Sequence, residues 1–181
     1  MPRFNKLLVL DLDETLVHAT EKKLEREPDF KVFDFYVYKR PGLDTFLEQY
    51  LEMYEVAVWT SSGDDYAKQV VDVIFKEREK LKILLTGSHC IRRFDHDLGC
   101  FYTVKDLQKM KKKTGFPLKS IIMVDDSKEK LERNYGNAVL IKEFIGQEDD
   151  GELFKLIKYL EIVGEVENVR GVDKLHWNKK Y

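Results

Sequence analysis

Cysteine, proline and glycine are all scarce in this sequence. Its 181 residues contain two cysteines, four prolines and ten glycines. Two cysteines cannot supply a disulfide framework. We interpret Cys90 and Cys100 as small buried-type side chains in a reducing compartment, with a pairing across a hairpin as the alternative. The low proline and glycine counts, with 43% hydrophobic and 35% charged residues, are typical of a globular protein.

A large net charge and long apolar runs are also missing. The net charge of −2 at pH 7 argues against a global basic field for nucleic acid and against charge-driven disorder. The apolar part of residues 1–14 is too short for a signal peptide and is broken by aspartates, and no window has the length of a membrane span. We expect an intracellular, soluble protein, cytoplasmic or nuclear, that binds neither nucleic acid nor membrane. The oligomeric state stays open, with a monomer as the simplest expectation.

Buried-type apolar runs alternate with segments of helical period. The runs predict strands at 7–10, 56–60, 82–86, 120–124 and 138–141, and the amphipathic segments predict helices at 43–54, 65–77 and 153–160. Residues 30–38 are predicted as a strand or hairpin arm from the period-two spacing of Phe33, Phe35 and Val37. This alternation predicts an α/β sandwich around a mainly parallel sheet with helices on both faces.

The expected organisation is one domain over residues 1–181, because a chain of this length can bury roughly two-thirds of its unfolded surface. The alternation breaks between residues 86 and 104, where the polar turn "DHDLG" separates Ile91 from Phe101. This predicts a small β-hairpin insertion at about 88–103. The core is expected at about 6–163, with a C-terminal tail at about 164–181.

Carboxylates and hydroxyls stand at the ends of three predicted strands. They are Asp11 and Asp13 after 7–10, Thr60, Ser61 and Ser62 at the end of 56–60, and Asp125, Asp126 and Ser127 after 120–124. Ligands of open α/β sheets bind outside the carboxyl ends of the strands. Helix capping explains Asp126 or Ser127 alone, but a cap needs one side chain and does not explain Asp11 together with Asp13. We therefore expect a functional site at this edge.

Four carboxylates at one edge repel one another unless a cation holds them. Hard oxygen ligands, without paired His or Cys, point to Mg²⁺ rather than zinc. The hydroxyls of Thr60 and Ser61, with the backbone N–H groups beside them, suit the oxygens of a phosphate. Lys105 is our candidate for offsetting charge on a phosphoryl group, and an ordinary surface lysine is the alternative.

Five motifs occur in the expected order for a known family. They are "LVLDLDETLVH", "KRPG", "VWTSS", "YTVKDL" and "IIMVDDS". The segment "DLDETL" resembles the DxDx[TV] signature of the haloacid dehalogenase superfamily, and the full set resembles its FCP/SCP branch of phosphoprotein phosphatases. The similarity runs from about Lys6 to Val163. It implies a Rossmannoid three-layer sandwich with a small hairpin insertion and no large cap domain.

The resemblance also implies roles for the strand-end residues. Asp11 would be the nucleophile that forms an aspartyl-phosphate, and Asp13 the general acid and base, with its backbone carbonyl on Mg²⁺. Thr60 and Lys105 would act on the phosphoryl group. Asp126 would bind the metal directly. Asp125 would bind it through water or would support the site.

Two departures from the family pattern concern the substrate. Polymerase-directed members commonly have Asp-Asn where this chain has Asp125-Asp126, and they have apolar residues for a substrate proline where residues 19–29 are charged. We interpret Phe33, Phe35 and Trp59 as core residues rather than as such a pocket. An uncapped site fits a phosphoserine or phosphothreonine in a protein or peptide. The alternatives are a small phosphate ester as substrate, or a non-catalytic protein-binding module.

Overall fold

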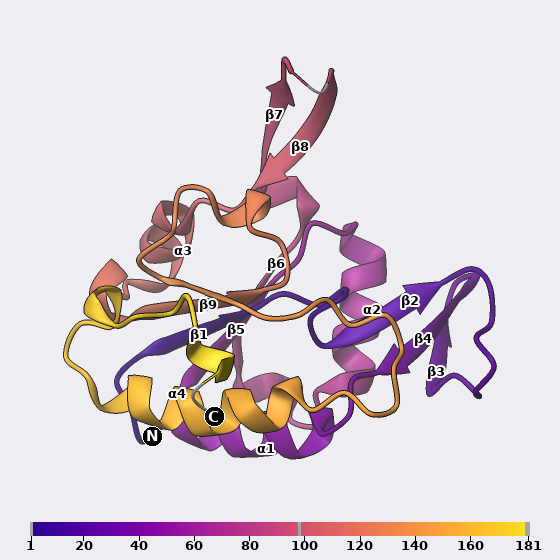
Figure 1. The fold of residues 1–181 in the computed structure, drawn as a ribbon, viewed down its shortest axis with the longest axis horizontal. Helices are drawn as coiled ribbons and strands as arrows, with labels where there is room; N and C mark the ends of the chain where they lie inside the picture. The colour runs from indigo at the N-terminus through magenta and orange to yellow at the C-terminus, as the bar shows by residue number, and fades with distance from the viewer. Residues whose placement is uncertain (1, 98, 180–181) are drawn as a thin grey trace.

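Five parallel strands form the central sheet of the computed structural model, which describes residues 2–97 and 99–179 (Figure 1). The strands stand in the order β10, β9, β1, β5, β6. Their bounds are β1 (Leu7–Leu10), β5 (Glu55–Trp59), β6 (Leu81–Leu85), β9 (Ile121–Asp125) and β10 (Ala138–Leu140). All four residues of β1 are fully buried, as the central strand of a two-sided sheet requires. The predicted mainly parallel sheet is confirmed.

Helices cover both faces of this sheet. They are α1 (Leu43–Met53), α2 (Asp64–Ile74), α3 (Leu107–Thr114) and α4 (Glu152–Glu165). Leu8 and Leu10 belong to the cluster packed against α1, α2 and α4, whereas Leu7 and Val9 pack with α3. The period-two alternation of side chains along a strand produces this division, and with it the three layers that were expected.

Short 3₁₀ helices connect several of these elements. Their bounds are η1 (Arg78–Lys80), η2 (Gly87–His89), η3 (Leu118–Ser120), η4 (Glu129–Leu131), η5 (Val169–Gly171) and η6 (Trp177–Lys179). Among the described residues, no helix combines the length and the apolar character that crossing a bilayer would need.

A three-stranded antiparallel sheet lies between β1 and α1 in the sequence. It contains β2 (Val17–Thr20), β3 (Phe30–Val32) and β4 (Phe35–Lys39), in the order β2, β4, β3. Residues 30–38 therefore form two strands joined by a turn. The prediction of one continuous strand with Phe33 in the core is wrong. Phe33 has a φ of 53° and is 59% exposed, because the chain reverses there to pair Val32 with Phe35. No large cap domain is present in the described ranges.

The predicted hairpin insertion is confirmed by β7 (Ile91–Asp95) and β8 (Cys100–Val104), which project from the body (Figure 1). Both cysteines are free. Cys90 is half-buried, but Cys100 lies exposed on the hairpin, so the expectation of a buried side chain is wrong for Cys100. Because the hairpin projects from the body, the side chains of its two strands have little to pack against.

The segment after residue 163 packs on the body of the protein. Val169 and Trp177 are buried, and the Trp177 indole donates a 2.7 Å hydrogen bond to the Leu140 carbonyl. The ring of Trp177 also lies 5.5 Å from that of Tyr159 in α4. This apolar contact gives residues 164–179 a defined place in the fold.

Candidate active site

The strand register brings the three acidic and hydroxyl-bearing strand ends to one edge. Leu10 pairs with Val58 on one side and with Val124 on the other. The Asp11 N–H donates to the Val124 carbonyl at 3.0 Å, which extends the ladder into the following turn. The residues that follow β1, β5 and β9 therefore emerge together, as expected for a parallel sheet.

The turn after β1 is fixed by its own backbone. Leu12 and Leu16 are fully buried, and the Leu16 N–H donates to the Leu12 carbonyl at 2.7 Å. Between them Glu14 has a φ of 59°, in the left-handed region that non-glycine residues seldom adopt. Strained residues of this kind are held by their surroundings and cluster at functional sites.

Three carboxylates gather at this edge. One oxygen from each of Asp11, Asp125 and Asp126 lies within 4.8 Å of the others. Asp11 and Asp125 are buried and Asp126 is half-buried. This set of hard oxygen ligands fits a divalent cation such as Mg²⁺.

Lys105 lies inside this cluster, so the surface-lysine alternative is wrong. Its side chain is fully buried, with Nζ 2.6 Å from Asp125 Oδ2 and 2.9 Å from Asp11 Oδ2. The loop that carries Lys105 precedes α3, whose N-cap residue Asp106 accepts a hydrogen bond from the Gln108 N–H. A buried ammonium is tolerated here because two carboxylates compensate it.

Lys130 is a second cation at the site, and it was not predicted from the sequence. Its Nζ lies 3.1 Å from Asp11 Oδ2 and also approaches Asp126, four residues earlier, at 3.8 Å. Burial lowers the pKa of Lys130, but the charges of Asp11, Asp125 and Asp126 outweigh burial and raise it. Asp126 lies in a bend and Lys130 in the 3₁₀ helix η4, so their spacing of four is not that of an α-helical turn, and no signal in the sequence marked Lys130.

The surroundings drive the pKa values of two carboxyls apart. Burial alone would raise the pKa of Asp11, but Lys105, Lys130 and the Leu12 N–H outweigh burial and lower it. Burial and the charge of Asp11 raise the pKa of Asp125 to about 7, against the opposing effect of the lysines. Of these two carboxyls, Asp11 is therefore the better stabilised in the ionised form.

Asp13 is held apart from the cluster by its own set of donors. Its carboxylate accepts hydrogen bonds from the hydroxyls of Ser62 at 2.6 Å, Tyr66 at 2.5 Å and Thr60 at 3.4 Å. Burial raises the pKa of Asp13 and the charge of Asp11 adds to this, although Ser62 and Tyr66 oppose it. A carboxyl with a raised pKa is suited to carrying a proton.

Ser62, rather than Ser61, makes the hydroxyl contact with Asp13. Thr60 is buried, and its hydroxyl accepts the Ser62 N–H at 3.0 Å, which fixes this loop. Ser61 is half-buried, and its main-chain carbonyl packs against Gly87. The contact of Tyr66 with Asp13 was not predicted, because the amphipathic pattern of residues 65–77 indicates only that one face of a helix is buried.

A buried ion pair supports the turn that follows β1. Arg40 and Asp150 pair through two contacts of 2.8 and 2.9 Å, and Arg40 also donates to the Thr15 carbonyl at 3.0 Å. The Thr15 hydroxyl in turn donates to Asp126 Oδ1 at 3.3 Å. The pair thus connects residues far apart in the chain to the carboxylate cluster.

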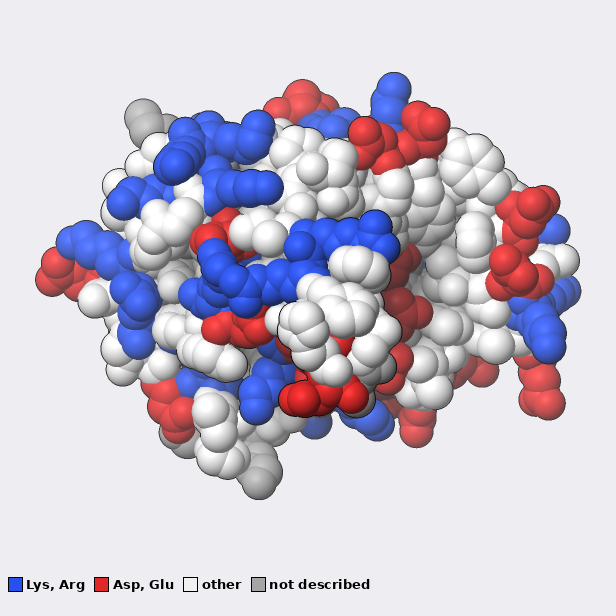
Figure 2. Space-filling model, turned by 90° about the horizontal axis from the view of Figure 1, so that it is seen from above, with Lys and Arg blue, Asp and Glu red and all other residues white. Residues whose placement is uncertain are grey.

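A pocket of about 370 Å³ opens beside Asp13. Its apolar wall contains Phe35, Ala19 and the ring of Tyr66, and Phe35 stacks edge-on against Tyr66 at 5.9 Å. The expectation of a core residue is correct for Trp59, which is fully buried. It holds in part for Phe35, which is half-buried and packs against the core but also lines this pocket. Seen from the hairpin side, Figure 2 shows acidic side chains recessed beside the hairpin, with Lys and Arg gathered nearby.

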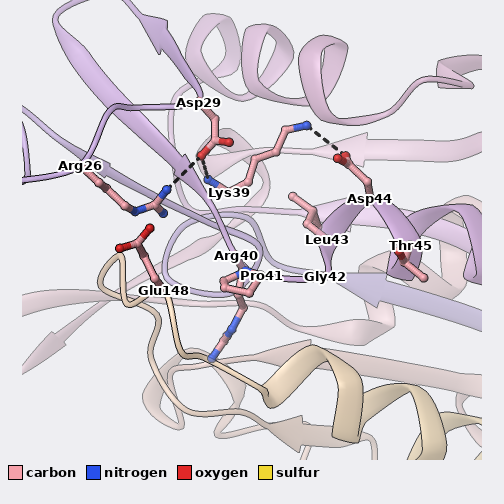
Figure 3. Close-up of a pocket in the computed structure, with 10 residues that line it drawn as sticks. All are labelled: Arg26, Asp29, Lys39, Arg40, Pro41, Gly42, Leu43, Asp44, Thr45 and Glu148. Carbon is pink, nitrogen blue, oxygen red and sulfur yellow. Dashed lines mark hydrogen bonds and ion pairs between the residues drawn. The ribbon is translucent and has the colours of Figure 1, made fainter.

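A second pocket, of about 390 Å³, lies at the turn from β4 to α1 (Figure 3). Four of its charged side chains form two ion pairs, Arg26 with Asp29 and Lys39 with Asp44. The guanidinium of Arg40 points away from this pocket toward its partner Asp150. The strand-end cluster is therefore the stronger candidate for chemistry.

The fold and the acidic strand edge define a haloacid dehalogenase-like α/β protein. The fission yeast RNA polymerase II CTD phosphatase Fcp1, solved as an R271A variant bound to beryllium fluoride, shares this fold. It aligns with a TM-score of 0.58 at 17% identity, over 91% of this chain and 53% of its own. The model of the NLI interacting factor-like phosphatases matches residues 6–170. The chain belongs to this family, within the FCP/SCP branch.

Curated relatives agree with this assignment. A probable C-terminal domain small phosphatase of Dictyostelium discoideum is 36% identical over 173 residues, which cover 91% of this chain and 53% of the relative. CTD nuclear envelope phosphatase 1 of Xenopus tropicalis is 32% identical over 182 residues, covering 92% and 70%. This chain spans about half the length of the first of these relatives.

Proposed function

We propose that this chain is a Mg²⁺-dependent phosphatase that hydrolyses phosphoserine or phosphothreonine in proteins through an aspartyl-phosphate on Asp11. The observation that carries the proposal is that the surroundings shift the pKa values of Asp11 and Asp13 in opposite directions. Asp11 is held ionised by Lys105 and Lys130, whereas the pKa of Asp13 is raised. Nucleophilic catalysis followed by proton transfer needs this division of roles.

In the first step an oxygen of Asp11 attacks phosphorus while the bond from phosphorus to the serine or threonine oxygen breaks. Asp13 donates its proton to that leaving oxygen. In the second step Asp13 takes a proton from water, whose oxygen attacks phosphorus. The bond between Asp11 and phosphorus then breaks, inorganic phosphate leaves, and both carboxyls return to their starting states.

Other residues of the site hold the phosphoryl group and the metal. Thr60, Ser61 and Lys105 are proposed to bind phosphoryl oxygens. The proposed metal ligands are the side chains of Asp11 and Asp126, the backbone carbonyl of Asp13, and Asp125 directly or through water. Bound Mg²⁺ supplies positive charge to the phosphoryl oxygens.

The substrate class is proposed from the shape of the site. Within the part of the chain that the structure describes, no large cap covers the site, and the apolar pocket beside Asp13 offers contacts for a residue next to the phosphorylated one. The similarity to a probable C-terminal domain small phosphatase and to CTD nuclear envelope phosphatase 1 supports a phosphoprotein substrate. A small phosphate ester would leave this pocket unused.

The test is release of phosphate from p-nitrophenyl phosphate and from a phosphoserine peptide, with Mg²⁺ and with EDTA. We expect turnover that needs Mg²⁺ and disappears in a folded Asp11→Asn variant, because an amide is not a nucleophile here. The peptide should have the higher kcat/KM. A folded wild-type protein without turnover would refute the proposal in favour of a protein-binding module.

A further inference from the structure

Lys130 places a positive charge inside the carboxylate cluster. Its Nζ lies 3.1 Å from Asp11 Oδ2, 3.8 Å from Asp126 Oδ1 and 3.9 Å from Asp125 Oδ1. These are the three residues whose oxygens gather within 4.8 Å of one another. One ammonium group therefore contacts the same three carboxylates that are proposed to surround the metal.

The backbone delivers Lys130 to this position. Lys130 lies in η4, shortly after β9, and its main-chain carbonyl accepts a hydrogen bond from the Lys105 N–H at 2.8 Å. The two lysines differ in exposure, because the side chain of Lys130 is 22% exposed and that of Lys105 is fully buried. Lys105 is thus enclosed by the protein, whereas part of the Lys130 side chain is in contact with solvent.

The charge of Lys130 changes the balance of the cluster. The cluster with Lys130 carries one unit less negative charge than the cluster without it, whichever form Asp125 takes. The cluster without Lys130 attracts a divalent cation more strongly. It also repels a phosphate dianion more strongly, so a single side chain acts on the two ligands in opposite directions.

We propose that Lys130 is a tethered counter-ion of the metal site, which weakens Mg²⁺ binding and strengthens phosphate binding. The inference rests on the proposed Mg²⁺ site. Its physical basis is competition, since the ammonium and the metal are attracted by the same oxygens of Asp11 and Asp126. A lysine serves this purpose better than a fixed ligand because its long side chain can move out as the metal enters.

The test is calorimetric titration of the metal-free protein with MgCl₂. We expect the Kd for Mg²⁺ to fall by about tenfold in Lys130→Met, because one charge is removed at close range. Lys130→Arg retains the charge and should remain within about threefold of wild type. Lys128→Met is the matched control, since Lys128 lies two residues earlier and is exposed, and its Kd should not change.

A second titration uses inorganic phosphate at saturating Mg²⁺. Its Kd should rise severalfold in Lys130→Met and stay unchanged in Lys128→Met. Circular dichroism checks that each variant is folded, and Lys130→Gln replaces Lys130→Met if the latter is not.

Unchanged or weaker Mg²⁺ binding in folded Lys130→Met, with binding by wild type, would overturn this inference and leave the proposed phosphatase standing. An arginine variant that behaves like the methionine variant would also overturn it, because the charge would not be the cause. Absence of Mg²⁺ binding in every variant would overturn both the inference and the metal requirement of the proposed function.

Discussion

Replacing Asp150 by asparagine should destabilise the protein strongly at neutral pH. The side chains of Arg40 and Asp150 are 0% and 4% exposed, and two hydrogen bonds of 2.8 and 2.9 Å join them. Breaking a buried pair by removing one charge costs about 3–5 kcal/mol. Arg40 keeps its bonds to the carbonyls of Thr15 and Lys142, so we expect the lower end, about 3 kcal/mol.

The loss should depend on pH in a defined direction. Burial raises the pKa of Asp150, but the hydrogen bonds and charge of Arg40 outweigh burial and lower it. A carboxyl with a lowered pKa in the folded state stabilises the protein above its unfolded pKa of about 3.9. That stabilisation is lost as the pH falls through the folded pKa. The difference between wild type and Asp150→Asn should therefore be complete at pH 7 and shrink as the pH falls below about 4.

Urea denaturation followed by tryptophan fluorescence measures both quantities. Asp149→Asn is the control, because Asp149 is the exposed neighbour and its replacement should change the free energy of unfolding by less than about 0.5 kcal/mol. A loss below about 1 kcal/mol at pH 7 for Asp150→Asn, or a loss that does not change on acidification, would refute the reasoning.

Three further predictions concern the loops and the pocket around the site. Gly87→Ala places a methyl group against the carbonyls of Ser61 and Ser62. We expect the free energy of unfolding, followed by thermal denaturation, to fall by about 1–3 kcal/mol and the activity to decrease. An unchanged melting temperature would contradict this. Ser62→Ala removes the 2.6 Å hydrogen bond to Asp13 and should lower kcat about tenfold, and full activity would show that this contact is dispensable. Phe35→Ala opens the apolar wall beside Asp13. It should raise KM for a phosphopeptide about tenfold more than KM for p-nitrophenyl phosphate. Equal effects on both substrates would show that the pocket does not bind peptide.

Much of the fold was readable from the sequence because its signals are local. The apolar runs at 7–10 and 120–124 correspond to β1 and β9 to within one residue, and the polar turn at 95–99 lies in the hairpin of β7 and β8. The period-two pattern misled at Phe33, because a tight turn can interrupt a strand without a change in side-chain spacing. Helix ends were less accurate, as α2 ends at Ile74 and not at residue 77.

The carboxylate pair at Asp11 and Asp13, the hydroxyl of Thr60 and the acidic pair at Asp125 and Asp126 were predictable in position. Each follows an apolar strand, and parallel strands bring their carboxyl ends together. The sequence by itself therefore determined the chemical character of this edge and the kind of ligand it suits.

Only the tertiary structure decided the contacts of each group, and through them its pKa. Asp13 depends on Ser62 and Tyr66, some fifty residues away, while Lys105 and Lys130 meet Asp11 from segments about a hundred residues distant. No local pattern marks such partners, because a lysine or serine in the interior looks the same in sequence as one in solvent. The charge and pKa of a site arise from burial and from short distances, and both exist only once the chain has folded.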